Sequence, residues 1–130
     1  MADTHQSRAQ DEATLLAASK SDPENAELKH VLATTLARNG KFKDALIYFR
    51  QAASLAPDNP AALMGVAQTL NSIDEHNVEA LAVYAKVAHR FPDTVFGKVA
   101  KQILARAEKA LLKHEISPAN ESAKPQTTNE

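Results

Sequence analysis

Three of the six prolines are separated by two nearly equal intervals, and this spacing constrains the fold more than any other feature. Pro23 and Pro57 are 34 residues apart, and Pro57 and Pro92 are 35 apart. Two apolar residues precede each proline at the same distances, namely Leu15 and Ala18, Phe49 and Ala52, and Tyr84 and Val87. Self-similarity at this period indicates a stacked repeat, in which each unit buries its apolar face against its neighbours.

Each period contains two apolar stripes with helical spacing. The first spans residues 28–36 and is followed by Asn39-Gly40, where glycine accepts the left-handed conformation that ends many helices. The second spans residues 42–52, and Asp58-Asn59-Pro60 then provides capping side chains and a proline suited to a first helical turn. The next period repeats both stripes over residues 63–70 and 78–87. The low glycine and aromatic content also favours an all-α fold.

The order of small and large residues resembles that of the tetratricopeptide repeat, W-x2-L-G-x2-Y, then A-x3-F, then P. The resemblance covers residues 11–112 and implies an α-solenoid of about six helices, arranged as antiparallel pairs. The second repeat has one extra residue in its inter-helix turn, and Lys29 and Leu63 replace the tryptophan. The other matching positions are Leu32-Ala33, Leu36, Ala45, Phe49, Ala52 and Pro57, and then Val66-Ala67, Leu70, Ala80, Tyr84 and Pro92.

The predicted domain spans residues 11–114, between a disordered N-terminus over residues 1–10 and a disordered, polar tail over residues 115–130. Within it we predict an N-terminal capping helix over 11–21, repeats over 26–59 and 60–93, and a C-terminal capping helix over 94–114. The first cap should cover repeat one with Leu15, Leu16 and Ala18. Asp93 or Thr94 should cap the last helix. Its final stripe, Leu104, Ala107 and Leu111, should pack on the domain, although a partner helix is the alternative.

Residues that carry chemistry are scarce. There is no cysteine, and the three glycines are isolated, so a thiolate site and a phosphate-binding loop are excluded. We therefore predict no catalytic residue, metal or cofactor, and no enzyme activity. The acidic turn before His76 is interpreted as solvated. No two of the five histidines are spaced as ligands on one helical turn; they are His5, His30, His76, His89 and His114.

Charge and hydropathy restrict the partners and the location. The pI of about 6.5 and the lack of aromatic residues among the C-terminal lysines argue against nucleic-acid binding. No apolar stretch approaches the roughly 18 residues that span a bilayer, and no signal sequence is evident. We therefore predict no membrane insertion and a cytoplasmic location.

The family resemblance implies that a partner lies in a concave groove formed by the first helices of the repeats. The chaperone-tail clamp of some members is absent, because its lysine and asparagine positions hold His30, Thr34 and Gly65. The groove instead suits an extended segment or an amphipathic helix. Helical phase places these residues in it: Glu27, His30, Thr34, Ala37, Arg38, Ala61, Met64, Gln68, Asn71, Ser72, Gly97, Lys98 and Lys101.

Two kinds of function fit these features. The first is a non-enzymatic adaptor or scaffold that binds a protein partner in the groove, with a secretion-type chaperone as a related version. The second is self-assembly into a homo-oligomer. Residues 1–28 have a net charge of −4 and residues 98–113 of +4, so the two ends could pair between copies.

Overall fold

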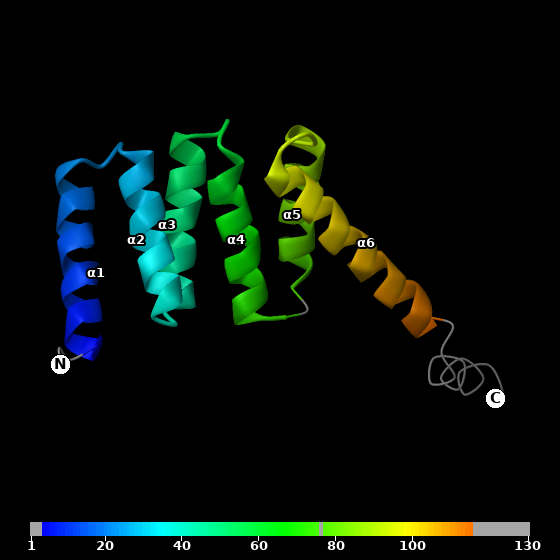
Figure 1. Cartoon of the computed structure of the whole chain (residues 1–130), viewed down its shortest axis with the longest axis horizontal. Helices are drawn as coiled ribbons and strands as arrows, with labels where there is room; N and C mark the ends of the chain where they lie inside the picture. Colours follow the sequence, from blue (N-terminus) through cyan, green and yellow to red (C-terminus); the bar gives the residue numbers. More distant parts are fainter. Residues whose placement is uncertain (1–3, 76, 116–130) are drawn as a thin grey trace, which may run out of the picture.

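The computed structural model describes residues 4–75 and 77–115, which form a row of helices without strands (Figure 1). Consecutive helices pack on one another, and α2 and α6 also contact α4. The predicted all-α solenoid of helix pairs is therefore confirmed. The helices are α1 (Thr4–Ser21), α2 (Ala26–Arg38), α3 (Phe42–Leu55), α4 (Pro60–Ile73), α5 (Val78–Arg90) and α6 (Val95–Glu115).

The helix ends follow from local side-chain chemistry. After α2, Gly40 has a φ of +80°, and the Lys41 N–H donates to the Leu36 carbonyl at 2.9 Å, which closes the helix. The Asn59 side chain accepts from the Ala61 N–H at 2.9 Å, and Pro60 opens α4. The turn before α5 lacks a glycine, and the capping side chain there is that of Asn77, which accepts from Ala80. The Thr94 hydroxyl accepts from the Gly97 N–H at 3.0 Å and caps α6.

Small residues at the repeat positions allow the helices to approach closely. Four alanines at these positions have no exposed surface, and Phe49 and Tyr84 fill the space between neighbouring units. Because a longer side chain would separate the paired helices, this pattern of short and large residues determines the spacing of the stack. The four alanines are Ala33, Ala45, Ala67 and Ala80.

The N-terminal helix is longer than predicted. α1 begins at Thr4, so the prediction of a disordered segment over residues 1–10 is wrong from residue 4 onward; residues 1–3 lie outside the described residues. Residues 4–10 contain no glycine or proline, and their glutamine, arginine and alanine favour a helix despite their polarity. Leu15 and Leu16 pack on the core as expected, but the fully buried residue is Ser19, one position after Ala18.

α6 closes the other end of the stack. Its buried Ala100 and half-buried Val99 and Ile103 belong to the face that packs against the body. Val66, Ala67 and Leu70 are buried in α4. The equivalent positions of α6, 35 residues later, are Lys101, Gln102 and Ala105, and all three are exposed. A polar outer face of this kind ends a repeat stack, because no further helix can bury surface on it.

The last turns of α6 lie beyond the body of the molecule (Figure 1). The prediction that Leu111 packs on the domain is wrong, since 59% of its surface is exposed, as is 55% of that of its neighbour Leu112. The cause is the direction of α6, which leaves α5 at an angle and leaves its final turns without a neighbour among the described helices. The predicted disordered tail lies outside the described residues after Glu115, which is still helical.

Candidate functional site

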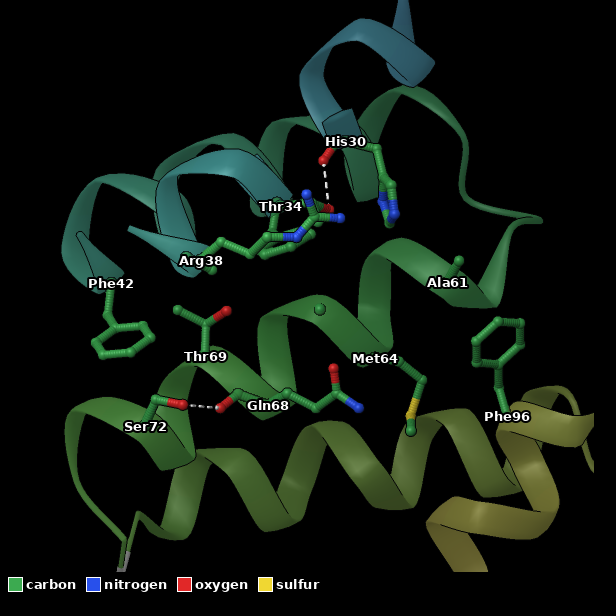
Figure 2. A pocket seen from close by; sticks show the side chains of 13 residues that line it. His30, Thr34, Arg38, Phe42, Ala61, Met64, Gln68, Thr69, Ser72 and Phe96 are labelled. Carbon is green, nitrogen blue, oxygen red and sulfur yellow. Dashed lines mark hydrogen bonds between the residues drawn. The ribbon is translucent and has the colours of Figure 1, made fainter. Parts of the chain in front are cut away.

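A groove of about 490 Å³ lies between α2 and α4 and is bordered at one end by α6 (Figure 2). It is lined mainly by the first helices of the two predicted repeats, α2 and α4. We call it the α2–α4 groove. Its lining residues are His30, Thr34, Ala37 and Arg38 of α2, Phe42 and Phe49 of α3, Ala61, Met64, Gly65, Gln68, Thr69 and Ser72 of α4, and Phe96 of α6.

The deepest part of the groove is apolar. Met64 and Phe49 are only 3% and 5% exposed, so they contribute to its floor. The His30 ring meets the Phe49 ring edge to face, with centroids 5.4 Å apart and an angle of 72°. This contact orients the imidazole beside the floor and is worth roughly 1 kcal/mol for an aromatic pair. Gly65 provides the room for Phe49, because a Cβ at this position would overlap the ring.

Polar groups lie above this floor. The Thr34 hydroxyl donates to the His30 carbonyl at 2.9 Å, and the Ser72 hydroxyl donates to the Gln68 carbonyl at 3.0 Å, so each keeps free lone pairs as an acceptor (Figure 2). Within the described part of the chain, the Arg38 guanidinium and the Gln68 amide have no hydrogen-bonded or ionic partner. The groove therefore offers both donors and acceptors beside an apolar floor.

The groove holds few ionisable groups. His30 and Arg38 are the only ones among its lining residues. Over residues 4–75 and 77–115, no group of three or more histidine, cysteine, aspartate or glutamate residues could hold a metal ion. In the same ranges, no helix is both long and apolar enough to cross a bilayer.

Comparison with known proteins identifies the segment that carries most of this groove. The tetratricopeptide repeat family matches residues 26–69, which comprise α2, α3 and α4 as far as Thr69. Residues 26–69 are a tetratricopeptide repeat. Repeats of this family generally mediate contacts between proteins.

A curated relative matches a longer stretch of the chain. Protein O-mannosyl-transferase Tmtc3 of Drosophila melanogaster is 34% identical over 68 residues. The match covers 52% of this chain but only 7% of that protein, so this chain corresponds to a small part of the relative.

Most residues that helical phase assigned to the groove lie around it. They are the ones on the first helices of the tetratricopeptide repeat and of the following unit: His30, Thr34, Ala37, Arg38, Ala61, Met64, Gln68 and Ser72. Two consecutive first helices thus present the same face, as their common register predicts.

The remaining candidates lie outside the α2–α4 groove. Glu27 borders a separate hollow of about 370 Å³ near the start of α2. The Asn71 side chain is hydrogen-bonded to the buried Tyr84 hydroxyl; burial raises the pKa of Tyr84, and the Asn71 bond opposes that shift. Lys98 and Lys101 project outward from α6 at positions 35 residues after Leu63 and Val66. The fifth, Gly97, is buried against the turn before α6.

Sequence reasoning missed five lining residues: Phe42, Phe49, Gly65, Thr69 and Phe96. Phe49 and Gly65 contribute to both the core and the groove, and a pattern that assigns each residue one role overlooks such positions. Phe96 carried a usable signal, because it lies 35 residues after Ala61, the same interval that separates Pro57 and Pro92. Counting that interval forward from Ala61 would have placed Phe96, not Gly97, in the groove.

Proposed function

We propose that the chain is a non-enzymatic interaction module that holds a segment of a partner protein in the α2–α4 groove. The observation that carries this proposal is the groove itself, in which two successive first helices present an apolar floor and unpartnered polar side chains. Its volume of about 490 Å³ is within the range of roughly 300–1,000 Å³ that is usual for binding pockets. In this role the chain is an adaptor or scaffold that requires no cofactor.

An extended segment or an exposed helix fits this groove better than a compact small molecule. The groove runs along helix faces and is open to solvent, so a long ligand can enter without any movement of the repeats. The Gln68 amide can pair with main-chain groups, and the Met64 thioether adapts to different apolar side chains. The lack of cysteine suits a reducing compartment, and we propose the cytoplasm as the location.

A steric block of the groove tests this proposal. Gln68 is exposed in the middle of α4, so Gln68→Trp should fill the groove without disturbing the core. Gln102→Trp makes the same change on the exposed outer face of α6 and is the matched control. A glutamate at Met64 would be a poor choice, because it places a charge at a site that is only 3% exposed.

The measurement is peptide binding to the full chain. Peptides selected from a displayed random library on the wild-type protein should bind Gln68→Trp at least about tenfold more weakly, and Gln102→Trp normally. Circular dichroism should show that both variants remain folded. If selected peptides bind both variants as well as they bind the wild type, the groove is not the binding surface.

Self-assembly is a second candidate, and the exposed end of α6 favours it. Leu111 and Leu112 are more than half exposed on a helix whose neighbouring charges are mostly basic. An acidic surface on a second copy would suit them, and residues 1–28 supply net negative charge. Glu12 is less available for this role, since Lys41 and Asn39 already bind it within the same chain.

A further inference from the structure

We propose that the α2–α4 groove selects a partner segment with a carboxylate next to an apolar side chain, and that Arg38 binds the carboxylate. This inference rests on the proposed function, and it adds the chemistry of the partner. The observations that support it are the charge within the groove, the free state of the Arg38 side chain, and the arrangement of polar and apolar groups along the groove.

The charge of the groove has one sign. Arg38 is the only lining residue with a permanent charge, and no aspartate or glutamate lines the groove. The ion pairs found among the described residues are Lys41 with Glu12 and Arg50 with Glu79, and neither involves Arg38. An arginine in a groove that is lined by apolar side chains and by no acidic residue attracts a carboxylate and can bind it through two parallel hydrogen bonds.

The position of Arg38 in α2 has a simpler explanation that must be weighed. It lies in the last turn, where a basic residue stabilises the negative end of the helix dipole. However, the carbonyls of that turn already accept from the backbone N–H groups of Asn39, Gly40 and Lys41. The guanidinium has no bond to them in the described part of the chain, and its five donors remain available to a ligand.

Figure 2 shows how the polar and apolar side chains are arranged along the groove. Arg38 reaches from α2 into the space over α4, near Thr34, while Met64, Ala61 and Phe96 lie toward the other end. A carboxylate bound by Arg38 would thus place a neighbouring side chain over the apolar end. Phe96, which is 37% exposed, forms the outer border of that end.

A carboxylate fits this site better than a phosphate. Phosphate groups in peptides are usually bound by clusters of arginines, whereas the groove contains one. The cations on neighbouring elements do not complete such a cluster, because Lys41 is paired with Glu12 and Lys101 projects outward from α6. A phosphorylated peptide is therefore one arm of the test and not a second proposal.

The test is a double-mutant cycle between Arg38 and the peptide. The probe is a library peptide that binds the wild type but not Gln68→Trp, synthesised with its acidic residue as aspartate, asparagine or phosphoserine. The proteins are the full-length wild type, Arg38→Gln and, as matched control, Arg106→Gln on the exposed face of α6. Replacing aspartate by asparagine should weaken binding about tenfold for the wild type and Arg106→Gln, but less than about twofold for Arg38→Gln.

Each outcome has a distinct meaning. Three results would overturn the inference while leaving the interaction module intact. The first is an equal loss of affinity, on changing aspartate to asparagine, for Arg38→Gln and the wild type. The others are groove-binding peptides without acidic residues and tighter binding of the phosphoserine form. If the library yields no peptide that is sensitive to Gln68→Trp, the proposed function fails and the inference fails with it.

Discussion

Two glycines of this chain allow close contacts, but the groups they face differ in stiffness. A Cβ at Gly97 would overlap the carbonyl oxygen of Phe91, which belongs to the backbone of the turn between α5 and α6. A Cβ at Gly65 would overlap the ring of Phe49, which belongs to a side chain and not to the backbone. Backbone cannot move without shifting the helices attached to it, so the same substitution should have unequal costs at the two positions.

We expect Gly97→Ala to lower the free energy of unfolding by about 1–3 kcal/mol, which is typical of overpacking. Gly65→Ala should lower the free energy of unfolding less than Gly97→Ala does, because its overlap is with a ring and not with backbone. In addition, an alanine in a helix interior stabilises the helix by about 1 kcal/mol relative to glycine. Urea unfolding followed by circular dichroism measures both values. A Gly97→Ala variant as stable as the wild type would show that the turn does not lie as close to α6 as described.

At the scale of elements, polar contacts of the Glu12 side chain attach α1 to the rest of the fold. Glu12 accepts a hydrogen bond from the Lys41 ammonium at 2.7 Å and another from the Asn39 amide, so one carboxylate joins α1 to the turn between α2 and α3. The bond from Lys41, followed by that from Asn39, holds the pKa of Glu12 below its ordinary value. The folded state therefore resists protonation of Glu12 more than the unfolded state does.

This difference predicts a pH dependence of stability. A carboxyl group with a lowered folded-state pKa contributes stability above its unfolded-state pKa, and that contribution is lost as the pH falls through the folded-state value. At pH 7 the melting temperature of Glu12→Gln should thus lie below that of the matched Glu108→Gln, whose carboxylate is exposed on α6. As the pH falls through the lowered folded-state pKa of Glu12, the two variants should converge, because the Glu12 carboxylate then becomes protonated and loses its ionic bond to Lys41. A constant difference from neutral to acid pH would contradict the ionic role of Glu12.

The helices differ in how well the sequence predicts them. The middle helices were predictable because their signals agree: Gly40 ends α2, Asn59 caps α4, and the buried alanines follow the repeat. The terminal helices were harder, since each packs on fewer neighbours and its phase is less constrained. In α1 the buried position is Ser19, not Ala18, and in α6 the groove residue is Phe96, not Gly97.

The site shows a second limit of sequence reasoning. Helical phase assigns one face of α4 to the groove, but it does not show which side chains on that face already contact other helices. The amide of Asn71 bonds to Tyr84, so it is part of the packing between α4 and α5. Likewise, Phe49 borders the groove only because Gly65 leaves space for its ring. Both facts depend on contacts between residues distant in the sequence.

At the scale of the whole molecule, the number of first helices sets the size of the binding surface. Within the described part of the chain, α2, α4 and the start of α6 border the groove, with two phenylalanines of α3 beneath them, so a bound segment would be short. α6 presents a polar outer face to any further repeat but extends past the body with apolar side chains near its end. Within the described residues, the α2–α4 groove and the last turns of α6 are thus separate surfaces that both carry apolar side chains.

The second surface leads to a prediction about self-association. Leu111 and Leu112 contribute little to folding because more than half of each is exposed, so Leu111→Gln with Leu112→Gln should leave the melting temperature nearly unchanged. If these residues bind an acidic surface of another copy, sedimentation velocity at high protein concentration should show oligomers for the wild type at about 10 mM salt and fewer at about 500 mM. The double variant should be monomeric at both. Ile47→Gln, an equally exposed apolar position on α3, should behave as the wild type. A wild-type protein that is monomeric at every concentration and salt would rule out self-association through the last turns of α6.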